Sequence, residues 1–146
     1  MIAQTIQLAL APVFVLVAMG NILNILSTRL GRVVDRARVL QNAHMATEGM
    51  EHDLVVAEIR MIDRRIVLIT HAVRLMVLTG LTIGATVALL FLEQLAGVDL
   101  QLVAGAMFLL AVLLLMAGLV LFLRETQIAA QQLRIPRAYL ELERDI

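Results

Sequence analysis

Three long apolar stretches separated by charged stretches dominate the pattern of this chain. They run from about residues 6 to 28, 66 to 92 and 100 to 123. Each is long enough for a helix that crosses a bilayer, which needs about 20 residues. The apolar residues are continuous and do not alternate as in a membrane barrel, and a helix satisfies its own backbone hydrogen bonds in lipid. The pattern predicts an all-α membrane protein with three transmembrane helices, forming a single domain over residues 1–146.

Helical periodicity continues beyond the first two apolar stretches. One apolar stripe follows the first stretch and consists of Leu30, Val33, Val34, Ala37 and Leu40. Another apolar stripe precedes the second stretch and consists of Val55, Ile59, Ile62 and Ile66. The pattern breaks around residues 42–52, where Thr47 and Gly49 interrupt it. We therefore expect residues 29–65 to form an antiparallel helical hairpin outside the bilayer. In the tail, residues 124–146, a polar helix should end before Pro136, and residues 137–146 form either a short amphipathic helix or a frayed end.

The distribution of arginine predicts the orientation. All 12 basic residues are arginine; seven lie in segment 29–65, four lie from residue 124 onward, and none lies in loop 93–99. Because cytoplasmic loops carry the excess of positive charge, we expect the N-terminus outside, and the hairpin and the C-terminus in the cytoplasm.

Composition narrows the possible functions. Hydrophobic residues make up 61% of the chain and charged residues 16%, against about 25% charged in a soluble domain, so a soluble enzyme is disfavoured. Zero net charge gives no argument for nucleic-acid binding, and the absence of cysteine excludes disulfides and cysteine-based zinc sites. No nucleotide loop, metalloprotease motif or potassium-filter motif is present. We predict no catalytic residues, no cofactor and no metal; the minor alternative is a metal at the hairpin tip, held among His44, Glu48, Glu51, His52 and Asp53.

The first apolar stretch carries a polar stripe. Asn21, Asn24 and Thr28 share one helical face, and Phe14 and Val17 precede them on the same face. Two interpretations stay open. Asparagine can hydrogen-bond between helices in lipid, or the stripe can line a pore that has a hydrophobic constriction at one end.

Small residues in the other two stretches predict close helix packing. They fall at helical spacing in the second stretch and at seven-residue spacing in the third: Gly80, Gly84 and Ala88; then Ala104, Ala111 and Gly118. Three helices offer few buried seams for these surfaces, so we expect a homo-oligomer.

Several motifs resemble a known family. They are LAPVF at Leu10–Phe14, STRLGRVVDRARVL at Ser27–Leu40, IDRRIVLI at Ile62–Ile69 and LFLRETQIA at Leu121–Ala129. The chain resembles an uncharacterised family of bacterial membrane proteins known as a domain of unknown function, number two-seven-two-one. The resemblance implies three spans in a bacterial inner membrane and no particular activity.

The family motifs direct attention to charged residues where the apolar stretches end. Together with Arg74, which lies inside the second stretch, the candidates form an expected inner-face charge layer: Arg32, Asp35, Arg36, Arg65, Arg74, Arg124 and Glu125. Charge-assisted bonds in a partly desolvated layer would fix the register of the spans.

Two function hypotheses follow. The first is an ion-conducting channel or pore, lined by the first span of a homo-oligomer. The alternative is a membrane scaffold or regulator whose hairpin docks a cytoplasmic protein partner or lipid head groups. No spacing of polar residues specifies a reaction, so a membrane enzyme is disfavoured.

Overall fold

The structure, a computed structural model, describes residues 2–132 and is all-helical in that part. Helix α1 runs over Ile2–Ala46, α2 over Gly49–Ala96 and α3 over Gln101–Gln132. All three are long and apolar enough to cross a membrane. At 1.5 Å per residue, α1 and α2 are each about 70 Å long, more than twice the hydrocarbon thickness of about 30 Å.

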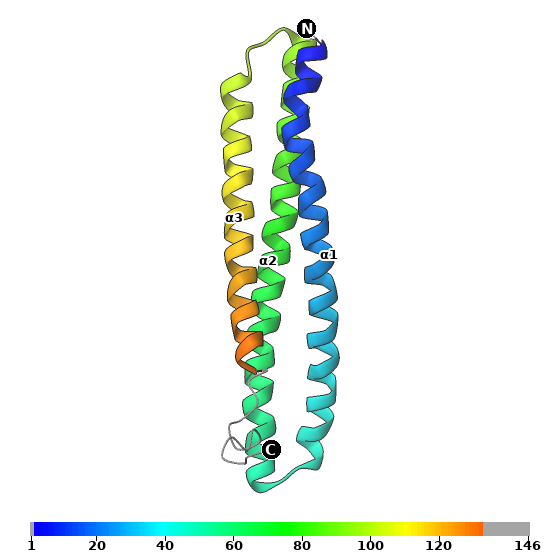
Figure 1. The fold of residues 1–146 in the computed structure, drawn as a ribbon, viewed down its shortest axis with the longest axis vertical. Helices are drawn as coiled ribbons and strands as arrows, with labels where there is room; N and C mark the ends of the chain where they lie inside the picture. Colours follow the sequence, from blue (N-terminus) through cyan, green and yellow to red (C-terminus); the bar gives the residue numbers. More distant parts are fainter. Residues whose placement is uncertain (1, 133–146) are drawn as a thin grey trace, which may run out of the picture.

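Helix α2 lies between the other two (Figure 1). It packs against both α1 and α3 along much of its length, whereas α1 and α3 scarcely contact each other. Most side chains in the three apolar stretches are therefore not buried within the chain. Such an open apolar surface suits hydrocarbon, and it leaves room for further protein contacts.

Buried side chains recur every seven residues on all three helices. On α1 the line is Met19, Leu26, Val33 and Leu40; on α2 it is Ile62, Ile69, Met76 and Ile83; on α3 it is Ala104, Ala111, Gly118 and Glu125. A seven-residue repeat keeps one seam of a helix against its neighbour, as in left-handed coiled coils. The α3 line predicted from spacing thus faces the protein, and it ends in a carboxylate.

Two glycines lie against methionine side chains of a neighbouring helix. A Cβ atom on Gly118 would lie 2.5 Å from Met76 Cε and 3.5 Å from Leu75 Cβ. A Cβ atom on Gly80 would lie 2.9 Å from Met19 Cε. Gly118 therefore lets α3 approach α2, and Gly80 lets α1 approach α2.

The turn between α1 and α2 is shorter than the sequence pattern suggested. Only Thr47 and Glu48 separate the helices, and α2 begins with Gly49 at a positive φ of 65°. Thr47 Oγ1 donates to the Ala43 carbonyl at 2.9 Å, which satisfies one of the last carbonyls of α1. At its other end α2 stops at Gly97, which has a φ of 68° and donates its N–H to Glu93 O.

The polar helix expected after the third apolar stretch is present as the last part of α3, which reaches Gln132. The expected helix end before Pro136 and the two alternatives for residues 137–146 lie outside the described residues.

Candidate functional site

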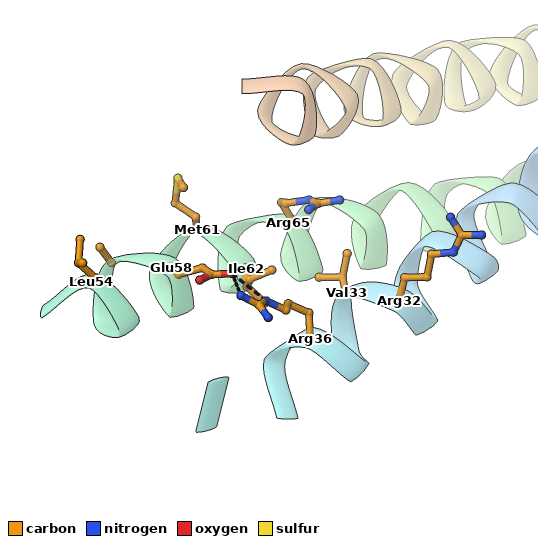
Figure 2. A pocket seen from close by; sticks show the side chains of 9 residues that line it. Arg32, Val33, Arg36, Leu54, Glu58, Met61, Ile62 and Arg65 are labelled. Atoms are coloured by element: carbon orange, nitrogen blue, oxygen red, sulfur yellow. Dashed lines mark hydrogen bonds and ion pairs between the residues drawn. The ribbon is translucent and has the colours of Figure 1, made fainter. Parts of the chain in front are cut away.

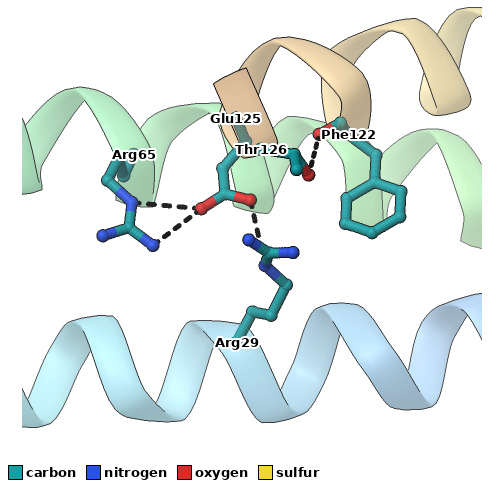
Figure 3. A network of polar contacts seen from close by, with 5 residues as sticks. All are labelled: Arg29, Arg65, Phe122, Glu125 and Thr126. Carbon is teal, nitrogen blue, oxygen red and sulfur yellow. Dashed lines mark hydrogen bonds and ion pairs between the residues drawn. The ribbon is translucent and has the colours of Figure 1, made fainter. Parts of the chain in front are cut away.

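A buried carboxylate connects all three helices (Figure 3). Glu125 of α3 is fully buried. Its Oε1 accepts two hydrogen bonds from Arg65 of α2, from Nε at 3.0 Å and from Nη2 at 2.9 Å. Its Oε2 lies 3.1 Å from Nε of Arg29 on α1, an ion pair without the alignment of a hydrogen bond. We call Arg29, Arg65 and Glu125 the Glu125 clamp.

Arg29 makes a second contact with α3. Its guanidinium carbon lies 5.4 Å from the centre of the Phe122 ring, within the range of a cation–π interaction. Phe122 and Glu125 lie three residues apart, so they share a face of α3. Because α1 and α3 scarcely touch otherwise, these contacts tie the two outer helices together.

The charges of the clamp do not balance. Two guanidinium groups meet one carboxylate, and the Arg65 and Arg29 side chains keep 16% and 29% of their surface exposed. A fully buried carboxylate without partners would be very costly, and the two arginines supply the opposite charge that offsets this cost. Both arginines join their own helix to α3 through Glu125, so the arrangement indicates a structural clamp.

The structure distributes the rest of the expected inner-face charge layer differently. Arg36 pairs with Glu58 across α1 and α2, with Nη2 at 2.7 Å and Nε at 2.8 Å from Oε1. Four further members are exposed and form no ion pair within residues 2–132: Arg32, Asp35, Arg74 and Arg124.

Sequence reasoning did not place Arg29 in this layer. A signal was available, because Arg29 follows the buried Leu26 by three residues and so borders the α1 seam. Arg32 lies a further three residues along and is exposed.

The polar stripe of α1 faces away from the other helices. Phe14 and Val17 are 69% and 62% exposed, and Asn21, Asn24 and Thr28 are exposed as well. Thr28 Oγ1 donates to the Asn24 carbonyl at 3.0 Å. Their spacing of three and four residues puts all five on one side of α1, which we call the outer face of α1, away from its buried seam.

A family profile described as a protein of unknown function (DUF2721) matches residues 9–135. The chain belongs to the DUF2721 family. This confirms the resemblance drawn from the sequence motifs, and the match includes the whole Glu125 clamp and the outer face of α1. No curated protein and no solved structure matches the chain. Since the family description gives no activity, function must be argued from the geometry.

The small residues of this DUF2721 chain fall into two groups. Gly80 contacts α1, and the α3 line of Ala104, Ala111 and Gly118 is buried. Gly84 and Ala88 are exposed, and a Cβ atom on Gly84 would meet nothing within 4 Å. The second group is therefore free to contact another molecule.

At the hairpin tip, the structure brings two of the candidate metal ligands together. The rings of His44 and His52 lie 4.4 Å apart, tilted by 55°. Within the described residues, no group of three or more histidine and carboxylate side chains could hold a metal ion.

Proposed function

We propose that the chain assembles into a homo-oligomer in a bacterial inner membrane and that the outer face of α1 lines an ion-conducting pore on its axis. The observation that carries the proposal is the exposure of Phe14, Val17, Asn21, Asn24 and Thr28 on one side of α1. The distribution of arginine favours an orientation with the hairpin in the cytoplasm.

The cost of polar groups in lipid supports the assembly. Asn21 and Asn24 lie inside the apolar stretch of α1, and neither α2 nor α3 covers them. Polar side chains within a bilayer normally face other protein or a water-filled cavity. A ring of copies with α1 toward the axis would provide both. The exposed Gly84 and Ala88 would then be available for contacts between subunits.

The order of residues along the outer face of α1 supports a gated pore. The bulky apolar Phe14 and Val17 come first, and Asn21, Asn24 and Thr28 follow toward the charged hairpin. An apolar constriction can stop ions by dewetting, while amides and hydroxyls can replace part of an ion's water shell. Three helices in a single copy enclose no axis, so conduction requires several subunits.

Substituted cysteines test the pore directly, because the natural chain has no cysteine. In liposomes, Asn24→Cys should react with a water-soluble thiol reagent, and Leu113→Cys, exposed on α3, should not.

Phe14→Ala should raise ion flux and Asn24→Leu should lower it, with Leu113→Ala as the matched control. Native mass spectrometry should give a ring of several subunits. A monomer or dimer, or no flux across several ions and voltages, would contradict the proposal.

A second candidate function is a scaffold whose hairpin docks a cytoplasmic protein. Exposed apolar side chains at the hairpin tip favour it: Met45, Met50 and Leu54 are 89%, 83% and 68% exposed. These residues lie beyond the apolar stretches, where lipid would not cover them. Replacing all three by serine should abolish binding of a stoichiometric partner without changing ion flux. If no stoichiometric partner is captured by the unmodified protein, this candidate fails.

A further inference from the structure

Two hollows meet at Arg32 on the flank of α1 and α2. The first, of about 830 Å³, is lined by residues of the hairpin, including Arg36, Glu58 and Met61 (Figure 2). The second, of about 440 Å³, is lined by Asn24, Ile25, Thr28 and Arg29. Arg32 and Arg65 line both hollows. We call the two together the Arg32 groove.

The Arg32 groove carries an excess of positive charge. Four arginines line it: Arg29, Arg32, Arg36 and Arg65. Glu125 binds two of them, and Glu58 binds Arg36. Four positive charges therefore meet two negative ones. The excess positive charge is centred on Arg32. Its guanidinium forms no ion pair in the part of the chain that the structure describes. The side chain points away from Arg36, toward earlier residues of α1 (Figure 2).

The position of the groove suits one kind of anion. Ile25 and Thr28 lie in the last turn of the apolar stretch of α1, and Arg29 and Arg32 lie in the first turn of the charged stretch that follows. When the apolar stretch occupies the hydrocarbon, this transition coincides with the phosphate groups of the lipids. An apolar wall at Ile25 with a guanidinium beyond it fits an acyl chain joined to a phosphate.

We propose that the Arg32 groove binds the phosphate of an anionic phospholipid, with Arg32 as the principal ligand. A guanidinium offers two parallel N–H donors that match two phosphate oxygens. Arg29 and Arg65 contribute positive charge from the wall while they hold Glu125. The excess of two positive charges favours a lipid with a net negative charge, such as phosphatidylglycerol, over zwitterionic phosphatidylcholine. Asn24 and Thr28 belong both to the groove and to the outer face of α1, so the groove lies at the hairpin end of that face. One copy forms the whole groove, so lipid binding can be measured whether or not the chain forms a pore.

The test is lipid binding to the full chain in neutral detergent, measured by native mass spectrometry. Phosphatidylglycerol should bind more tightly than phosphatidylcholine. Arg32→Gln should weaken phosphatidylglycerol binding about fivefold, the effect of one basic residue at a membrane surface. Arg124→Gln is the matched control, because Arg124 ends the apolar stretch of α3, is exposed and lines neither hollow.

Three results would overturn the proposal. Unchanged phosphatidylglycerol binding by Arg32→Gln would remove Arg32 as the ligand. An equal loss in Arg124→Gln would show diffuse electrostatic attraction with no defined site. Displacement of the lipid by millimolar inorganic phosphate would assign the groove to a free anion. Far-UV circular dichroism of both variants checks that they fold, which is expected because neither side chain forms an ion pair within the described residues.

Discussion

Replacing Glu125 by glutamine should destabilise the protein more than any other single charge change near the clamp. The substitution keeps one oxygen that can accept from Arg65, but it removes the negative charge and turns an amide N–H toward Arg29. Breaking a buried ion pair costs about 3–5 kcal/mol. Because Arg65 and Arg29 remain 16% and 29% exposed and one acceptor survives, we expect the lower end, about 3 kcal/mol.

Thermal unfolding in detergent measures this loss. For a chain of this size, about 3 kcal/mol corresponds to a fall in Tm of roughly 10 °C. Far-UV circular dichroism is the suitable probe, because the chain contains no tryptophan. A double-mutant cycle with Arg29→Gln isolates the contact between α1 and α3, and its coupling energy should be about 1–2 kcal/mol.

Two exposed charges serve as controls for the clamp. Asp35→Asn and Arg124→Gln change side chains that form no ion pair among the described residues, so each should stay within about 0.5 kcal/mol of the unmodified protein. The clamp would be refuted if Glu125→Gln behaved like these controls, or if the cycle gave no coupling between Arg29 and Glu125.

Three further predictions concern packing and surface charge. Gly118→Val should cost about 1–3 kcal/mol by overpacking against Met76, whereas Gly105→Val, which meets open space, should show no such clash; equal losses in Tm would contradict this. Met76→Ala should lower the free energy of unfolding by about 2–5 kcal/mol, because Met76 is fully buried. An unchanged Tm would contradict the burial of Met76 between the helices. Arg36→Gln should cost less than about 1 kcal/mol, because its ion pair with Glu58 is exposed; a larger fall in Tm would mean that this pair also holds the hairpin.

The sequence alone was enough to predict the three apolar helices and the place where the first two separate. Hydropathy and helical period are local properties, so they can be read without knowing the neighbours of a residue. The same period placed Ala104, Ala111 and Gly118 on one line of α3, and all three are buried together with Glu125, the next residue on that line. Family membership, too, was recognisable from the motifs and is confirmed by the match over residues 9–135.

Partners across helices could not be predicted in this way. Spacing tells which face of a helix a residue occupies, but it does not tell which residue of the next helix lies at the same height. For α1 and α2, that height depends on the two-residue turn at Thr47–Glu48 and on how their buried side chains pack. The sequence predicted a broad charge layer that included Asp35. In the structure, Glu125 instead forms ion pairs with Arg29 and Arg65.

The arrangement of the helices also decided which surfaces stay open. The sequence identified the stripe from Phe14 to Thr28 and the small residues Gly84 and Ala88, but it could not say whether the same chain covers them. The stripe lies on the side of α1 away from α2, and Gly84 and Ala88 lie on a face of α2 that neither α1 nor α3 covers, so both sets remain exposed. Local pattern therefore determined the helices and their polar and apolar faces, and only tertiary packing, which sets the register and the neighbours of each helix, decided how those faces are used.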